Sequence, residues 1–203
     1  MAIKQLIMIF SFVCITPAFA QNYFDPVPPS ELGCLEREWG QINPTEADKK
    51  FDIENDFDKY GERISCKNFI TPTELNNFFT KMKKAVQHRD KEAVADLIPF
   101  PIRSSLDGME DVPEGSRAKS RSRNIKNKQE FIESYDDIML PTTIKIVQCL
   151  QLDNMMAHPN QGPATTLGEI WFYRDFDTRK LSIYRLSSSP EEHKHWLDKE
   201  CSW

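Results

Sequence analysis

The sequence lacks an excess of positive charge, which argues against a general nucleic-acid-binding protein. Its 203 residues carry 26 lysines and arginines against 31 aspartates and glutamates, whereas a nucleic-acid binder shows a basic excess. Internal repeats are missing too, and a chain with 39% hydrophobic and 11% aromatic residues is neither collagen, nor a coiled coil, nor wholly disordered. A chain of this length can bury one substantial core, so it needs no metal to fold.

Signature motifs of catalysis are also missing. The chain has no G-x-S-x-G, H-E-x-x-H, phosphate-loop or dinucleotide-binding glycine pattern, so the chemistries that depend on these motifs have no support in the sequence. It has no C-x-x-C pair either, and the wide spacing of its cysteines disfavours a zinc site. We therefore expect no cofactor and no metal, and an enzyme is the less favoured interpretation.

The first 20 residues form a predicted signal peptide. Lys4 supplies a positive start, residues 6–15 form an apolar run too short to span a bilayer, and Ala18-Phe19-Ala20 matches a cleavage site. We expect export to the periplasm or the medium after cleavage behind Ala20, with the mature chain starting at Gln21. No other stretch approaches transmembrane length, so no membrane span is expected.

Four cysteines would remain in the mature chain, namely Cys34, Cys66, Cys149 and Cys201. An even number in an oxidising compartment predicts two disulfides, for which three pairings exist. Sequence order favours Cys34 with Cys66 and Cys149 with Cys201. The first bond would close a loop near the N-terminus, and the second would tie the C-terminal tail to the body.

Negative charge is concentrated in residues 21–70, which hold 11 acidic and 6 basic residues. We interpret this segment as an acidic N-terminal extension that is either solvated and stapled by its own disulfide or an acidic surface for a basic partner. Residues 71–203 are expected to form the folded domain with a C-terminal tail. The i, i+4 pair of Ile53 and Phe57 predicts a short helix within the extension.

Helical signals dominate the first half of the expected domain. Thr71-Pro72-Thr73-Glu74 is a capping box, and apolar residues at helical spacing after it predict a helix that ends near His88. Asp90 can cap a second helix, and residues 127–138 form a predicted third.

The segment between the second and third helices carries two further predictions. Pro99-Phe100-Pro101-Ile102-Arg103 indicates a short edge strand. Residues 104–128 are rich in serine, glycine and charge, and they indicate a mobile loop.

Strand signals dominate the second half of the domain. Ile170-Trp171-Phe172-Tyr173 forms the strongest predicted strand, and residues 181–186 follow after a turn, which predicts a hairpin. Residues 142–150 are ambiguous, because their β-branched residues favour a strand while Pro141 at a first helical position favours a helix. Helices on one face of an antiparallel sheet give an α+β fold.

This order of elements resembles the α+β cone of nuclear-transport-factor-2-like (cystatin-like) proteins. The resemblance rests on residues 78–97, Phe100-Pro101-Ile102, residues 131–136 and Gly168-Glu169-Ile170-Trp171-Phe172, and it covers about residues 72–186. It implies helices packed on a curved, cone-like antiparallel sheet. Such proteins include isomerases, cyclases, dehydratases, secretion scaffolds and ligand-binding modules, so the resemblance implies a pocket and not a reaction.

Few residues suggest chemistry. Tyr135 and Asp136, at the end of the third predicted helix, are weak catalytic candidates, and Asp136 would serve as a general base if it were buried. The alternative is that Tyr135 packs in the core and Asp136 is solvated. His158 is expected to be a turn residue. His193 and His195 form an H-x-H pair without a fixed third ligand, which is weak support for a metal.

Candidate binding residues come from two segments. Arg117, Arg121 and Arg123 belong to the basic half of the predicted loop, which either holds an anionic ligand or acidic partner or is simply solvated. Trp171 and Tyr173 would offer an aromatic patch to a protein partner if they faced outward, and would line the cone if they faced the helices. We expect the second arrangement, in which both have a core role.

Two classes of function follow from these observations. The favoured one is a non-catalytic exported module that binds a protein partner or a small ligand, for example an immunity or inhibitor protein that caps a secreted toxin. The alternative is a small cone-pocket enzyme of the isomerase or hydrolase type. The pocket distinguishes the two, because an enzyme needs several convergent polar groups in an apolar cavity.

Overall fold

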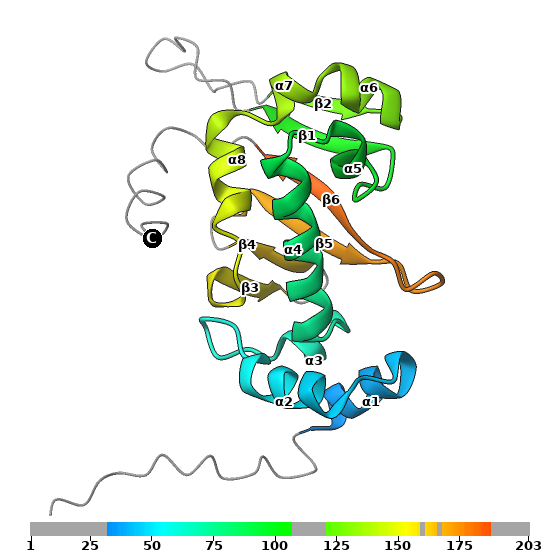
Figure 1. Cartoon of the computed structure of the whole chain (residues 1–203), viewed down its shortest axis with the longest axis vertical. Helices are drawn as coiled ribbons and strands as arrows, with labels where there is room; N and C mark the ends of the chain where they lie inside the picture. Colours follow the sequence, from blue (N-terminus) through cyan, green and yellow to red (C-terminus); the bar gives the residue numbers. More distant parts are fainter. Residues whose placement is uncertain (1–31, 107–120, 159–160, 166–167, 188–203) are drawn as a thin grey trace, which may run out of the picture.

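The computed structural model describes residues 32–106, 121–158, 161–165 and 168–187 (Figure 1). Over these residues the chain is α+β, with α-helices packed on a six-stranded sheet. The predicted fold class is therefore confirmed. The cone-like curvature of the sheet stays a prediction.

The sheet has the strand order β2-β1-β6-β5-β4-β3. Its strands are β1 (Ile102–Leu106), β2 (Arg121–Ile125), β3 (Met155–His158), β4 (Gly162–Thr165), β5 (Ile170–Arg174) and β6 (Leu181–Ser187). Strands β3 to β6 pair antiparallel in succession, which confirms the predicted β5–β6 hairpin. Strand β1 pairs antiparallel with β2 and parallel with β6. It therefore lies inside the sheet, and the prediction of an edge strand there is wrong.

The ends of the predicted loop over residues 104–128 belong to the sheet. Ser104 pairs with Arg123 and Leu106 with Arg121, so β1 and β2 form a ladder where the sequence indicated a mobile loop. The segment Arg121–Ile125 is almost entirely polar, and its strand conformation comes from backbone pairing with β1 rather than from an apolar pattern of its own.

Two helices, α4 (Pro72–Gln87) and α8 (Pro141–Gln148), cover one face of the sheet (Figure 1). Thr71 caps α4 as predicted: its hydroxyl accepts from the backbone N–H of Glu74, and the Glu74 carboxylate accepts from the backbone N–H of Thr71. Helix α8 resolves the ambiguous segment in favour of a helix, with Pro141 in its first turn. Pro141 lacks the N–H that would be unpaired there anyway, so the helical start costs nothing.

Three short helices lie at the β1–β2 end of the molecule, namely α5 (Lys91–Ala95), α6 (Lys128–Glu133) and α7 (Tyr135–Ile138) (Figure 1). Asp90 caps α5, since its carboxylate accepts from the backbone N–H of Ala93 at 2.9 Å. The third predicted helix is present but is interrupted at Ser134, which separates α6 from α7.

The N-terminal extension forms α1 (Gly33–Ile42), α2 (Glu46–Asn55) and α3 (Ile64–Asn68) at the opposite end of the molecule (Figure 1). The predicted disulfide between Cys34 and Cys66 is confirmed and joins α1 to α3. Helix α2 confirms the predicted short helix, although Phe57 lies beyond its end. Helix α1 was not anticipated from the sequence.

Buried carboxylates fasten the extension to the sheet and to α4. Asp52 accepts from the indole N–H of Trp39 and from the backbone N–H of Thr73, both at 2.7 Å. Asp58 accepts from the backbone N–H of Ala157 in β3, also at 2.7 Å. Burial raises the pKa of Asp52, and these two hydrogen bonds oppose that rise. Asp52 and Asp58 are therefore structural rather than solvated. Glu36, Glu46, Glu54 and Glu62 of the same extension are exposed, and for them the solvated surface and the partner surface both stay predictions.

Candidate functional site

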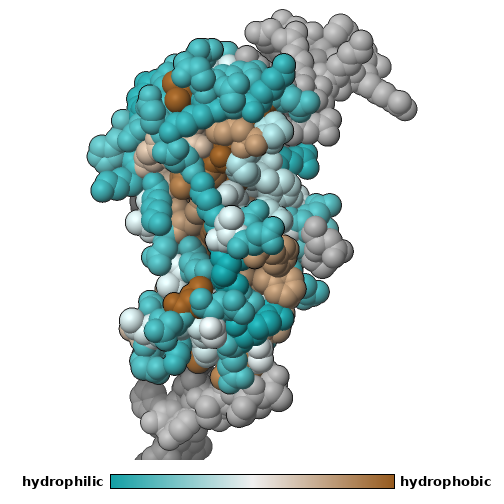
Figure 2. Space-filling model, turned by 90° about the vertical axis from the view of Figure 1, so that its right-hand side faces the viewer, coloured by the Kyte–Doolittle hydropathy of each residue, from teal (hydrophilic) through white to brown (hydrophobic). Residues whose placement is uncertain are grey.

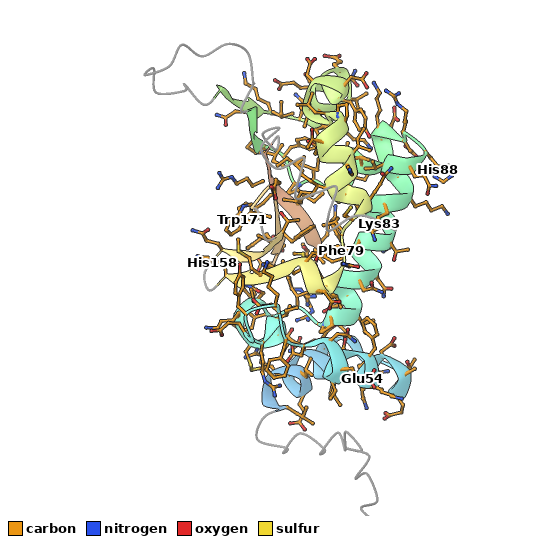
Figure 3. The ribbon with its side chains drawn as sticks, turned by 90° about the vertical axis from the view of Figure 1, so that its left-hand side faces the viewer. Glu54, Phe79, Lys83, His88, His158 and Trp171 are labelled. Atoms are coloured by element: carbon orange, nitrogen blue, oxygen red, sulfur yellow. A yellow bond between two sulfur atoms is a disulfide. The ribbon has the colours of Figure 1, made fainter. Side chains whose placement is uncertain are left out.

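Strand β5 has two different faces. Ile170 and Phe172 face α4, where the Phe172 ring packs against the rings of Phe78 at 5.7 Å and Phe79 at 5.3 Å. Trp171 lies on the other side of the sheet. Figure 3 labels Trp171 on that side and Phe79 on the side of α4. We call this side, opposite α4, the outer face.

A β-bulge brings extra side chains to the outer face. Trp171 is paired with Arg185 and Phe172 with Ile183, so Tyr184 is an additional residue in β6 with no partner in β5. A bulge re-aims a side chain locally. Tyr184 thus joins Arg185 on the outer face, where its ring lies 6.3 Å from that of Trp171.

Six rings form a continuous row on the outer face, and we call them the outer row: Phe69, Phe176, Tyr173, Tyr184, Trp171 and His158. Each ring contacts the next in nearly edge-to-face geometry, with centroids 5.6 to 6.3 Å apart. Such pairs are favourable beyond the area they bury. Phe176 is 64% exposed and Tyr173 42% exposed, so one end of the row is open to solvent.

The expected orientation of Trp171 and Tyr173 toward the helices is wrong. Trp171 is buried, but it is buried on the outer face, where its indole N–H donates to the Gly168 carbonyl at 2.8 Å. Both rings lie on the outward side that the alternative interpretation described, and of the two only Tyr173 is exposed there.

The open end of the outer row borders a hollow of about 660 Å³, which we call the outer groove. Four of its lining residues are the rings Phe69, Tyr173, Phe176 and Tyr184, and three are the cations Lys67, Arg174 and Arg185. None of the described residues that line it is acidic. The groove is therefore a basic and aromatic site on a chain with an excess of acidic residues. Figure 2 shows one face of the molecule, on which hydrophobic side chains gather in small patches on a mostly hydrophilic surface.

Arg174 borders the groove, but its charge is balanced by two carboxylates. Its side chain is only 2% exposed and forms ion pairs with Glu74 and with Glu38, the latter at 3.8 Å. None of its guanidinium nitrogens makes a hydrogen bond of good geometry to a described residue. Glu38 also binds Arg179 at 3.1 Å, so this buried cluster links α1 to the turn after β5.

The rings of the groove are positioned by polar neighbours. The guanidinium of Arg37 lies 4.4 Å from the ring centre of Phe69, a cation–π contact that holds this ring against the groove. The Tyr184 hydroxyl donates to the Gln161 carbonyl at 2.7 Å. Burial raises the pKa of Tyr184 above its ordinary value.

The two catalytic candidates lie away from this groove. Tyr135 is buried against Phe131, and its hydroxyl has no hydrogen-bond partner among the described residues. Asp136 is 63% exposed and pairs with Arg89 and Lys91, each at 2.9 Å. The hydrogen bond from Lys91 is the largest cause that lowers the pKa of Asp136. The burial that a general base here would require is absent.

Several other predicted residues fall partly or wholly outside the described part of the chain. Arg117 lies outside it, and Arg121 and Arg123 belong to β2 but their side chains are not described. Cys149 is disulfide-bonded, and its predicted partner, Cys201, lies outside the described residues.

The histidines give no metal site in the part of the chain that can be described. His193 and His195 lie outside it, and within it no three His, Cys, Asp or Glu side chains cluster as metal ligands would. His158, expected in a turn, ends β3 and contacts Trp171 at 5.8 Å.

Sequence reasoning missed Phe69, Phe176, Tyr184 and Arg185. One signal was present: the hairpin carries aromatic residues at 173, 176 and 184, more than its inner face alone requires. Phe69 had no such signal, because it reaches the groove from the end of α3.

No family model, curated protein or solved structure matches this chain. The resemblance to nuclear-transport-factor-2-like proteins accordingly stays a prediction. Among the helices of the described ranges, none is long and apolar enough to cross a membrane.

Proposed function

We propose that this protein is an exported, non-catalytic binding module that takes its ligand in the outer groove. The proposal is supported by one observation above all: the exposed rings of Phe69, Tyr173 and Phe176 stand next to cations around a single hollow. Aromatic and arginine side chains carry most of the energy in protein interfaces. Because the rings already pack on one another, binding would cost little side-chain entropy.

The chemistry of the groove favours binding over catalysis. Its described lining has no carboxylate, histidine or cysteine, the usual general bases and nucleophiles. On the opposite face, the space between α4 and the sheet holds packed rings such as Phe78, Phe79 and Phe172. An isomerase or hydrolase built on Tyr135 and Asp136 is therefore the weaker proposal.

Export remains part of the proposal. The predicted signal peptide motivates it, and a disulfide such as Cys34–Cys66 is typical of proteins outside the cytosol. An immunity or inhibitor protein against a secreted toxin is one form that such a module would take. Intact-mass analysis of exported protein should show the loss of residues 1–20, and an unprocessed N-terminus would contradict export by this route.

A comparative capture experiment tests the groove. Mature wild-type protein and the variants Tyr173→Ser and Phe176→Ser are immobilised and exposed to extracts of the exported fraction. Tyr60→Ser is the matched control, because Tyr60 is 63% exposed but does not line the groove. We expect a partner that wild type and control retain and both groove variants lose. Equal recovery by all four proteins, at equal urea midpoints, would refute the proposal.

A further inference from the structure

The charge of the outer groove indicates the charge of its ligand. Arg185 is exposed and has no acidic partner among the described residues. Lys67 pairs with Glu62 at 3.1 Å, but Glu62 is half exposed, and such a solvated pair is weak and exchangeable. Lys67 comes from α3 and Arg185 from β6, so these two cations flank the groove from different elements.

The spacing of the rings indicates the shape of the ligand. Successive rings from Phe69 through Phe176 and Tyr173 to Tyr184 are 5.6 to 6.3 Å apart. Residues i and i+2 of an extended chain lie on the same side and about 6.6 Å apart. An extended segment therefore presents alternate side chains at nearly the interval at which the rings occur.

We infer that the outer groove binds an acidic, extended segment of a partner protein, with carboxylates at Lys67 and Arg185 and alternate apolar side chains against Phe69, Tyr173 and Phe176. This inference rests on the proposed function and specifies its ligand. Arginine and lysine form charge-assisted hydrogen bonds with carboxylates.

Three capped synthetic peptides serve as probes. In the first, glutamate alternates with tryptophan and tyrosine; in the second and third, glutamine or lysine replaces every glutamate. Binding of each labelled peptide to the mature protein is measured by fluorescence anisotropy at low and high salt. We expect the glutamate peptide to bind at least about tenfold more tightly than the glutamine peptide, and high salt to remove that difference.

Two variants locate the charge contact. Arg185→Gln should weaken the binding of the glutamate peptide several-fold and leave the binding of the glutamine peptide unchanged. Lys81→Gln is the control: it removes an exposed cation of α4, on the side of the sheet that the helices cover, and should change the binding of neither peptide. Arg185→Glu should shift the preference toward the lysine peptide. These variants change exposed side chains, and their urea midpoints should match that of wild type.

The outcomes separate this inference from the proposed function. If Tyr173→Ser abolishes partner capture while the glutamate and glutamine peptides bind alike, the inference of an acidic ligand is wrong, but the proposed binding function of the groove is kept. If Tyr173→Ser affects neither partner capture nor peptide binding, the inference and the proposed function are both wrong. Absence of binding by the glutamate peptide at millimolar concentration overturns the inference. Self-association of the wild-type protein would also overturn the inference if Tyr173→Ser abolished it, because the groove would then be occupied by a second copy of the chain.

Discussion

Removing the carboxylate of Asp58 should weaken the attachment of the N-terminal extension to the sheet. Its Oδ1 accepts from the backbone N–H groups of Tyr60 and Glu62 at 2.8 and 2.9 Å, and its Oδ2 accepts from that of Ala157 at 2.7 Å. The Ala157 N–H points away from β4 toward the open edge of the sheet, and Asp58 covers it. Such coverage also protects the edge strand from pairing with another chain.

The cost of Asp58→Ala follows from these three donors. The N–H of Ala157 would be left unpaired in a buried position, which costs about 1–3 kcal/mol. Tyr60 and Glu62 lie in an exposed loop, where water replaces the carboxylate, so each lost hydrogen bond costs about 0.5–1.5 kcal/mol. The variant should therefore lose about 2–6 kcal/mol of unfolding free energy, a large share of the roughly 5–15 kcal/mol of a typical domain.

Urea unfolding at constant slope measures this loss. Glu54→Ala is the matched control: it removes an acid from the same extension, but its pair with Lys50 is long, at 3.9 Å, and exposed. We expect the control within about 0.5 kcal/mol of wild type. Hydrogen exchange at Ala157 should accelerate in Asp58→Ala alone. A variant as stable as the control would show that Asp58 does not hold the extension to β3.

Three further predictions follow from the fold. Phe172→Ala should cost about 3–5 kcal/mol in urea melts, whereas Tyr173→Ala should cost less than about 1 kcal/mol; the reverse order would place the core on the outer face. Burial raises the pKa of Asp56 above its ordinary value of 3.8, so its contribution to stability is greatest below pH 3.8 and is lost as the pH rises through the raised value. The stability advantage of wild type over Asp56→Asn should therefore shrink as the pH rises from 3.8, and an advantage that grows with pH contradicts the assignment. Replacing Cys34 and Cys66 together by serine should lower the unfolding free energy by about 3–4 kcal/mol, because the bond spans 32 residues; an unchanged urea midpoint would argue against it.

Elements with local signals could be predicted from the sequence. The capping box and helical spacing of α4 depend on residues within one or two turns, and so does the cap at Asp90. Strand β2 could not be predicted in this way, because Arg121–Ile125 becomes a strand only by pairing with β1. The burial of Asp52 and Asp58 likewise depends on donors in α4 and β3, distant in sequence.

The candidate site was harder to predict than the fold for a physical reason. Strand β5 is apolar on both faces, so periodicity could not tell whether Ile170 and Phe172 or Trp171 and Tyr173 face the helices. The bulge at Tyr184 then changes which β6 side chains share a face. The groove itself combines residues from the end of α3, the β5 end and β6, which only the folded chain brings together.

The central claim, that the outer groove is the binding face, is tested most directly by site-specific photo-crosslinking. Benzoylphenylalanine replaces Phe176 in one variant and Tyr60 in another, both exposed aromatic positions, and each variant is irradiated with the captured partner. The account predicts that position 176 cross-links to the partner and that position 60 does not. Efficient cross-linking from position 60, with none from position 176, would contradict it.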